Sequence, residues 1–285
     1  MDRVTADVIS DIPMSIYFDP NSKQFALNFN ELTFWSSNFG YLLLDNIPLK
    51  QKMRALDVGC ATGFPLLELA DRLGNDSSLV GIDPWVAAVE YLKEKIDFRK
   101  TPNVTVTLGD TQKTLFENNH FDLIVSNLGL NNFENKDLVI RECYRILASD
   151  GRLAIATNYK GHMWEFYQAY RESLKELHLE SHLEKIDKDD NRRLTITEIQ
   201  SLFTTEGFVP SKTIEKKFFM RYVSGTAFLQ SSFIERCFMS TWKSLLPELE
   251  RNRVFSQIEN KLNAIALKAG ELKISIPMAY LEFTK

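Results

Sequence analysis

The sequence predicts an α/β fold: a doubly wound, Rossmann-like, mostly parallel sheet of seven strands, with helices on both faces and a helical insertion between the last two strands. From residue 54 onward, short runs of aliphatic and β-branched residues alternate with longer helical patterns. Runs such as LVGID, DLIVS and RLAIA are apolar on both faces. This is the pattern of parallel strands covered by helices on both sides, which right-handed crossovers connect.

Five strands and three helices are expected in the parallel part of the sheet. The strands are predicted at 54–59, 78–83, 103–109, 121–127 and 151–157. The helices between them are predicted at 65–73, 86–99 and 136–147. A strongly apolar helix candidate, NELTFWSSNFGYLLLDN at 30–46, precedes the sheet.

The pattern changes after the fifth strand. Helical stretches are predicted at 163–186 and 198–206, and long strands at 208–222 and 273–284. Between these two strands lie helical patterns rich in Phe, Leu and Trp. We therefore expect four segments: an N-terminal helical lid (1–50), a Rossmann-like ligand-binding core (51–224), a helical insertion or cap (225–270) and the last strand of the core (271–285).

Composition and charge indicate a globular protein and disfavour a nucleic-acid partner. The 285 residues are 44% hydrophobic and 25% charged, which is ordinary for a globular protein. A net charge of −4 disfavours a nucleic-acid partner, because such proteins more often carry a basic field. The three cysteines stand far apart without the spacing of metal ligands, so we expect reduced thiols and no metal site.

Neither an export signal nor a membrane span is predicted. The first residues, MDRVTADVISDIPMS, include acids and lack the apolar core of a secretory signal. No stretch reaches the ~18 apolar residues that would cross a bilayer. We therefore expect a cytoplasmic protein, whose oligomeric state the sequence leaves open.

A glycine loop follows the first predicted strand, in the segment ALDVGCATGFP at 55–65. A turn from strand to helix against a ligand requires residues without bulky side chains, and the spacing here is Gly59-x-Ala61-x-Gly63. A dinucleotide-binding loop would have a small residue at the next position, which is Phe64. The carboxylate of Asp57 would repel a pyrophosphate but suits a cation, such as the ammonium group of a sulfonium-bearing amino acid, directly or through water.

Acidic residues also follow the second and third strands. Asp83 stands 20 residues after Gly63, where a carboxylate can bind the ribose diol of either NAD or an adenosyl group. Pro84 and Trp85 offer a flat apolar surface for adenine, although Trp85 could equally pack between helix and sheet. Asp110, followed by Thr111, could accept from the adenine amino group or form a turn or helix cap.

Together these blocks resemble class I S-adenosylmethionine-dependent methyltransferases, and among them the branch that methylates quinones and small molecules. The resemblance lies in LDVGCATG, the acid in GIDP, the GD after the third strand, and FDLIVSNLGL followed by LASDGRLAIAT. The blocks span 54–158, and TITEIQSLFTTEGF resembles more weakly the helix before the sixth strand. One departure is Ala61, where the family usually has glycine; its methyl group is tolerable if φ stays negative.

The resemblance implies S-adenosyl-L-methionine as the cofactor, bound at the carboxyl ends of the first four strands. The implied contacts are Asp57, Gly59, Cys60, Ala61 and Gly63 around the methionine part, Asp83 at the ribose, Pro84 and Trp85 at the adenine face, Asp110 and Thr111 at the adenine edge, and Asn127 and Leu128 beneath the reactive methyl group.

Methyl transfer from a sulfonium is an in-line displacement, which needs a base only if the acceptor arrives protonated. Candidate catalytic residues are Tyr159, His162 and Asn131. His162 could instead be a surface-loop residue, and Asn131 and its neighbour Asn132 could be turn or helix-cap groups. The Pro-Pro-aromatic signature of enzymes that methylate DNA amines is absent, because SNLGL stands in its place.

Three residues are candidates for contacts with the acceptor: Trp35, Asn132 and Arg221. Trp35 lies on the apolar N-terminal helix, which either closes over the acceptor or packs on the sheet edge. Arg221 could bind an anionic group, with the aromatic run FLQSSFIERCFMSTW as a roof over the substrate; an aromatic stripe at helical spacing is also typical of a core.

The segment DKDDNRRLTITE at 187–198 matches most positions of a calcium-binding loop. Its sixth position, however, is Arg192, where the sharp turn requires glycine. The alternative is a charged surface turn followed by a capping box, with Thr195 as N-cap and Glu198 at the third helical position. We favour the capping box.

The sequence thus predicts a methyltransferase that acts on a small, apolar or anionic metabolite. Two alternatives stay open: an NAD-linked oxidoreductase on a similar fold, against which Phe64 and Asp57 argue, and a non-catalytic domain that binds S-adenosylmethionine. The acceptor, and which of its atoms receives the methyl group, are not determined by the sequence.

Overall fold

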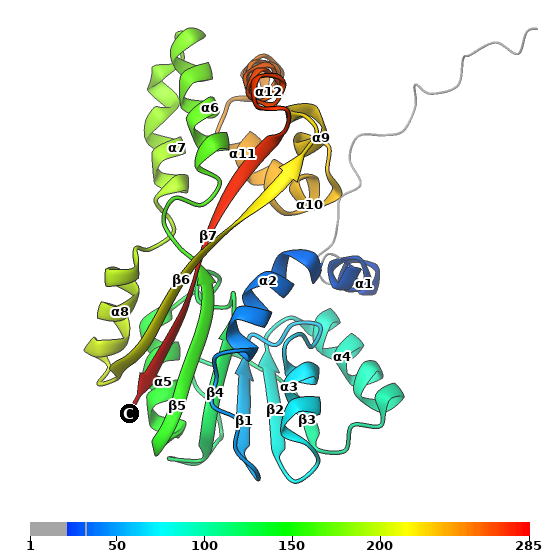
Figure 1. Ribbon diagram of the computed structural model, residues 1–285, viewed down its shortest axis with the longest axis vertical. Helices are drawn as coiled ribbons and strands as arrows, with labels where there is room; N and C mark the ends of the chain where they lie inside the picture. The colour runs from blue at the N-terminus through cyan, green and yellow to red at the C-terminus, as the bar shows by residue number, and fades with distance from the viewer. Residues whose placement is uncertain (1–21, 32) are drawn as a thin grey trace, which may run out of the picture.

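The computed structural model describes residues 22–31 and 33–285 (Figure 1). Its centre is a seven-stranded sheet in the order β3-β2-β1-β4-β5-β7-β6. The strands are β1 Arg54–Val58, β2 Ser78–Asp83, β3 Val104–Leu108, β4 Phe121–Asn127, β5 Leu147–Asn158, β6 Val209–Tyr222 and β7 Leu272–Thr284. The first five are parallel, and β7 lies antiparallel between β5 and β6. The predicted doubly wound, mostly parallel sheet is therefore confirmed.

Helices cover both faces of the sheet, because both faces are apolar. Two clusters of buried side chains lie on opposite sides. One packs α2 (Thr33–Leu44), α3 (Leu66–Leu73) and α6 (Trp164–Glu176) against the sheet, together with the insertion. The other packs α5 (Lys136–Ile146) and α8 (Ile196–Thr205). Helix α4 (Val86–Arg99) connects β2 to β3, as predicted.

The insertion between β6 and β7 is helical, as expected from its composition. It contains α9 Gly225–Leu229, α10 Ser232–Ile234, a π-helical turn Glu235–Met239, α11 Ser240–Ser244 and α12 Glu248–Ala269. Much of its aromatic content is core: the rings of Phe166 and Trp242 stack with their centroids 3.7 Å apart. Trp242 and Phe228 are fully or almost fully buried.

The register of the last two strands carries this insertion past the edge of the sheet. β5 ends at the pair Asn158–Met278, whereas β6 and β7 remain paired as far as Tyr222–Leu272. Six further residues of β7 therefore extend beyond the carboxyl end of β5, on the order of 20 Å of strand. In Figure 1 the two long strands rise from the sheet and carry α9–α12 at their upper end.

Two predicted helices differ from those observed. The stretch predicted at 163–186 is divided: α6 ends at Glu176, His178 adopts a positive φ of 57°, and a short 3-10 turn (Glu180–His182) leads into α7 (Leu183–Asp190). The helix predicted at 30–46 is preceded by a second one, α1 (Lys23–Glu31). Residues 1–21 of the predicted N-terminal lid lie outside the described residues.

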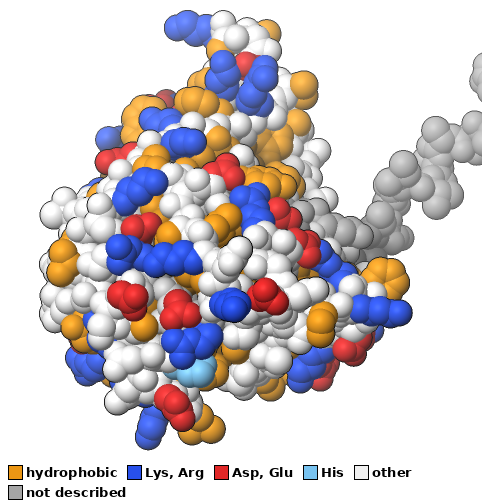
Figure 2. Space-filling model, turned by 60° about the horizontal axis from the view of Figure 1, so that its bottom comes forward, with side chains coloured by type: hydrophobic (Ala, Val, Ile, Leu, Met, Phe, Trp, Pro, Cys, Tyr) orange, Lys and Arg blue, Asp and Glu red, His pale blue; other side chains and the backbone are white. Residues whose placement is uncertain are grey.

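On the face visible in Figure 2, Lys and Arg side chains are interspersed with Asp and Glu, so this face carries a mixed charge. Surface pairs of this kind include Arg54 with Asp122 at 2.9 Å. In the described part of the chain, no helix is long and apolar enough to cross a membrane.

The predicted capping box is present. Thr195 Oγ1 accepts from the Glu198 amide at 3.2 Å, and the Glu198 carboxylate accepts from the Thr195 amide at 2.7 Å. The first four positions of the calcium-like pattern are helical, because α7 continues to Asp190. Two of its acids, Asp187 and Asp190, pair with Arg171.

We therefore expect Thr195→Ala to lower the free energy of unfolding by about 1 kcal/mol, because α8 loses a side-chain cap. Thr195→Ser keeps the hydroxyl and should unfold close to the unsubstituted chain. Urea unfolding monitored by circular dichroism measures both. Equal stability of the Ala and Ser variants, or a calcium-dependent midpoint, would contradict the assignment.

Candidate active site

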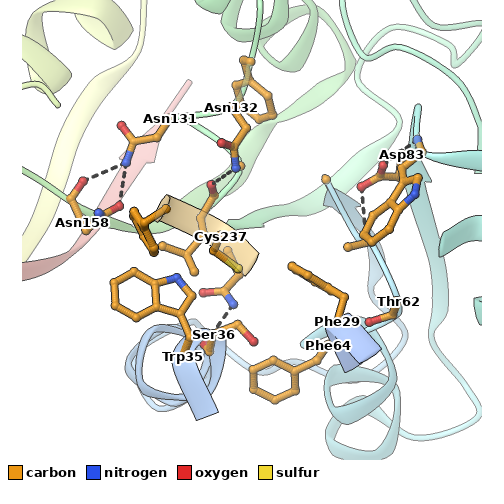
Figure 3. Close-up of a pocket in the computed structure, with 18 of the residues that line it drawn as sticks. Phe29, Trp35, Ser36, Thr62, Phe64, Asp83, Asn131, Asn132, Asn158 and Cys237 are labelled. Carbon is orange, nitrogen blue, oxygen red and sulfur yellow. Dashed lines mark hydrogen bonds between the residues drawn. The ribbon is translucent and has the colours of Figure 1, made fainter. Parts of the chain in front are cut away.

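A cavity of about 550 Å³ lies at the carboxyl ends of β1, β2, β4 and β5. Parallel sheets of this type bind ligands at this edge, where the strand order reverses between β1 and β4. Figure 3 shows Asp83 and Thr62 on one side of the cavity, and Asn131, Asn158 and Trp35 on the other. Its wall combines the strand ends with both helical accessories: Phe29 from α1, Trp35 from α2, and Phe233, Phe238 and Trp242 from the insertion.

The glycine loop forms the floor of one half. Gly59 and Gly63 have φ values of 81° and 100°, and a Cβ at Gly63 would lie 2.4 Å from Leu92 Cδ1. Ala61 also has a positive φ, 43°, so the condition stated for tolerating its methyl group, a negative φ, is not met. The left-handed conformation costs roughly 1–2 kcal/mol for a residue with a Cβ. The Ala61 amide donates to Asp83 Oδ2 at 2.8 Å, a charge-assisted hydrogen bond that offsets part of this cost.

Asp83 connects the glycine loop to the turn after β2. Its second oxygen, Oδ1, accepts from the Trp85 amide at 2.8 Å. Burial raises the pKa of Asp83, and the two backbone amides partly offset the rise. Asp83, Pro84 and Trp85 all line the cavity. Trp85 also packs edge-on against Phe29 of α1, with centroids 5.2 Å apart, so it contributes to both the cavity wall and helix packing.

Asp57 lies beneath the glycine loop and does not line the cavity. Its side chain is 0% exposed, and neither carboxylate oxygen accepts a hydrogen bond of normal geometry from the described residues. Burial and the neighbouring Asp83 raise the pKa of Asp57 to about 8, while the Leu66 amide acts weakly in the opposite direction. Asp57 is thus a buried acceptor without a full set of donors.

Four other predicted cofactor contacts lie outside the cavity wall: Cys60, Gly63, Asp110 and Thr111. Cys60 is fully buried, and its sulfur lies against β2, 2.8 Å from where a Cβ of Gly81 would stand. Asp110 is exposed and accepts from the Gln112 amide at 2.9 Å, which is the turn role considered as its alternative. Thr111 is buried beside it.

The end of β4 supplies the middle of the cavity. Asn127 and Leu128 line it, and Leu128 has a positive φ of 64°. Asn127 Nδ2 donates to the Ser36 carbonyl at 3.2 Å, which joins α2 to the sheet, whereas its buried Oδ1 has no partner among the described residues. A ligand with a donor at this position would satisfy that oxygen.

Asn131 and Asn132 also line the cavity, and their amides stabilise its loop. Asn131 Nδ2 donates to Asn158 Oδ1 at 2.8 Å and to Thr157 Oγ1 at 2.9 Å. Asn132 Nδ2 donates to the Leu128 carbonyl at 3.2 Å. These bonds hold the loop after β4 against the end of β5.

Tyr159 and Arg221 are placed away from the cavity. The Tyr159 hydroxyl donates to Glu215 of β6 at 2.9 Å; burial and this carboxylate raise the pKa of Tyr159 to about 12. Arg221 is exposed and pairs with Glu271 at 2.6 Å. Neither residue lines the cavity that holds Asp83 and Trp35.

His162 is 1% exposed, so the surface-loop alternative is wrong. Its ring packs against Trp35 and Phe238, which line the cavity, with centroids 5.4 and 5.9 Å away. Burial, and then the charges of Arg193 and Arg192, hold the pKa of His162 well below its ordinary value. The imidazole is therefore neutral and lies one layer behind the wall.

Several wall residues had no signal in the sequence. Arg192 and Arg193 line the cavity although their segment has the pattern of a charged surface turn. The turn reaches the cavity because the Lys160 amide, just after β5, donates to the Leu194 carbonyl at 3.0 Å. Only the tertiary structure shows this contact.

Comparisons with known proteins agree with the fold. The methyltransferase domain family matches residues 49–217, more than half of the chain. A demethylmenaquinone methyltransferase of Staphylococcus aureus is 28% identical over 128 residues, which are 45% of this chain and 52% of that protein. The chain thus spans about half the length of the curated relatives that it matches.

Solved structures share the fold at low identity. A SAM-dependent methyltransferase from Aquifex aeolicus has a TM-score of 0.54 and 19% identity, covering 69% of this chain and 92% of its own. Haemonchus contortus phosphoethanolamine N-methyltransferase 2, in complex with S-adenosyl-L-methionine, has a TM-score of 0.52 and 19% identity, covering 87% and 52%. With the family match, the chain belongs to the methyltransferase domain family.

Proposed function

We propose that this chain is an S-adenosylmethionine-dependent methyltransferase, which transfers the methyl group to a small-molecule acceptor bound in the same cavity as the cofactor. The observation that carries the proposal is the extent of that cavity, from Gly59 and Asp83 to Trp35 and Trp242. From β2 to β5 it crosses three strand spacings, about 14 Å. This length accommodates a nucleoside at one end and an acceptor at the other.

The half of the cavity at β1 and β2 suits the cofactor. We assign the ribose diol to Asp83, the adenine face to Trp85, and the methionine part to the backbone of Gly59, Ala61 and Gly63. Bound there, S-adenosylmethionine supplies a methyl group already activated by its sulfonium. The unpartnered Oδ1 of Asn127 and the carboxylate of Asp57 fit a ligand that brings an ammonium group. Because Asp57 lies behind the wall, we assign its contact to a bridging water.

The half at β4 and β5 suits the acceptor. Trp35, Phe233, Phe238 and Trp242 form an aromatic wall that excludes water and packs against an apolar body. Asn131, fixed by Asn158, holds the loop on which the acceptor would rest. We propose the helices α1 and α2 and the insertion 225–270 as the two sides of a lid.

Catalysis at this site would depend on the alignment of the acceptor atom with the methyl group. In-line displacement needs the acceptor atom within ~3–3.5 Å of the methyl carbon, which a rigid wall can provide. Neither Tyr159, held by Glu215, nor the buried His162 lines the cavity, so we assign neither as a base. An acceptor that arrives ionised needs none.

The test of this function is methyl release with a panel of quinols, carboxylic acids and phenols, followed as formation of S-adenosylhomocysteine. We expect turnover with members of one class and binding of S-adenosylmethionine without any acceptor. Absence of cofactor binding would overturn the proposal. The curated relatives' name, demethylmenaquinone methyltransferase, is the reason for including quinols.

Asp83→Ala should weaken S-adenosylmethionine binding about 10- to 100-fold, because the ribose loses a charged acceptor and Ala61 loses its anchor. Asp110→Ala serves as the matched comparison: this carboxylate is exposed and outside the cavity wall, so a change below about threefold is expected. Isothermal titration calorimetry measures both constants. Equal losses of affinity in the two variants would show that Asp83 does not bind the cofactor.

Asp57→Asn tests the buried carboxylate through its pH dependence. The pKa of Asp57 is about 8 in the folded chain and ordinarily 3.8, so folding takes up a proton between these values. Stability contributed by this residue therefore falls as pH rises through that window. The Asn variant cannot ionise, and its gain in Tm without cofactor should be larger at about pH 8.5 than at about pH 5.5. A gain independent of pH in differential scanning fluorimetry would contradict a protonated Asp57.

A further inference from the structure

Arg193 is an unusual residue for a cavity wall. It is 9% exposed, and its Nε and Nη1 atoms are buried without a hydrogen-bond partner among the described residues. An unpaired buried guanidinium is costly, because burial removes its hydration without replacement. A ligand group with oxygen acceptors would supply the hydrogen bonds that this guanidinium lacks.

The turn that carries Arg193 is held in place from several sides. The capping box at Thr195 and Glu198 fixes its exit into α8. Its entry is fixed by α7, where the Tyr167 hydroxyl donates to the buried Asp189 at 2.6 Å. The Leu194 carbonyl accepts from the Lys160 amide at 3.0 Å. The guanidinium is therefore fixed in position rather than free to move into solvent.

Nearby acids do not neutralise this charge. Asp189 accepts from Tyr167 and pairs with Arg192 Nε at 3.2 Å. Across residues 22–31 and 33–285, Arg193 makes no salt bridge. Burial lowers the pKa of Arg193 and Arg192 lowers it further, whereas Asp189 and a hydrogen bond with Tyr167 raise it. Two arginines and one carboxylate leave a net positive charge, and the neighbouring His162 is neutral.

We propose that Arg193, with Arg192 beside it, binds an anionic group of the methyl acceptor, a carboxylate or a phosphate. Nε and Nη1 of the guanidinium have no partner in the part of the chain that the structure describes, and each can donate a charge-assisted hydrogen bond to an oxygen of an anion. Trp35, Phe238 and Trp242 line the same cavity and receive the apolar part. The inference rests on the proposed function and specifies its substrate class.

The anionic group is an anchor rather than the methylated atom. The turn 191–195 is fixed to the residues after β5, which is two strand spacings from the glycine loop after β1, about 10 Å. An acceptor bound at Arg193 therefore extends towards Asn127 and Leu128, where the methyl group would be delivered.

The test uses the full chain saturated with S-adenosylhomocysteine and three matched probes: phenylacetate, benzylphosphonate and the neutral phenylacetamide. Calorimetry should show at least one of the two anions binding about tenfold or more tighter than the amide. The tighter anion distinguishes a carboxylate from a phosphate site. Equal affinity for all three overturns the inference, and the binding of S-adenosylhomocysteine in the same experiment shows that the proposed function survives. Failure of S-adenosylhomocysteine to bind overturns both.

Two variants test whether Arg193 causes the preference for the anion. Arg193→Met should abolish the preference for the anion, leave S-adenosylhomocysteine affinity unchanged, and raise Tm without ligand, because it removes an unpaired buried charge. Arg221→Met, in an exposed arginine paired with Glu271, should keep the preference. Loss of the preference in Arg221→Met but not in Arg193→Met would overturn the inference. If Arg193→Met does not fold, Arg193→Lys is used in its place. The Lys variant should keep a reduced preference for the anion over the amide, and an undiminished preference would contradict the proposal.

Discussion

The carboxylate of Asp83 holds together the two loops on which the cavity depends. One oxygen fixes the Ala61 amide in the glycine loop, and the other fixes the Trp85 amide at the start of α4. Because Ala61 has a left-handed conformation that a side chain disfavours, the loop depends on this carboxylate for its shape. Asp83 lines the cavity as well, so the same group that shapes the loop is available to a ligand. Structure and binding are thereby coupled through one side chain.

The second half of the cavity depends on strand length. β6 and β7 continue past the end of β5, and the helices between them fold back over the carboxyl edge of the sheet. Trp242 then stacks on Phe166 of α6, and Phe233 lies against Trp35 of α2 with centroids 5.0 Å apart. Segments separated by 76 and by 198 positions in the sequence meet through these two pairs of rings.

The parallel sheet, the glycine loop and the capping box could be predicted because each depends on local chemistry: apolar runs, residues without bulky side chains, and a Thr three positions before a Glu. The positive φ of Ala61 could not, since it follows from a hydrogen bond to Asp83, 22 residues away. Arg193 has the sequence context of a surface turn but is buried, in a turn whose Leu194 carbonyl accepts from the Lys160 amide. Arg221 sits in an equally basic context and is exposed. Sequence spacing does not distinguish these two arginines; tertiary contacts do.

Acidic residues lie at one end of the cavity and basic residues at the other. Asp57 and Asp83 are buried where the proposed cofactor brings an ammonium and a sulfonium, and burial raises the pKa of both. Arg193 is buried where the proposed acceptor brings an anion, and burial lowers its pKa. Burial of these groups costs desolvation energy at each end, and the groups at the other end, on the order of 10 Å or more away, offset little of it. Each ligand pairs with the buried groups at its own end of the cavity, so its binding should stabilise the fold. The same pairing places the two reactants in one orientation, in which the cationic methyl donor faces an acceptor whose anionic end is held by Arg193.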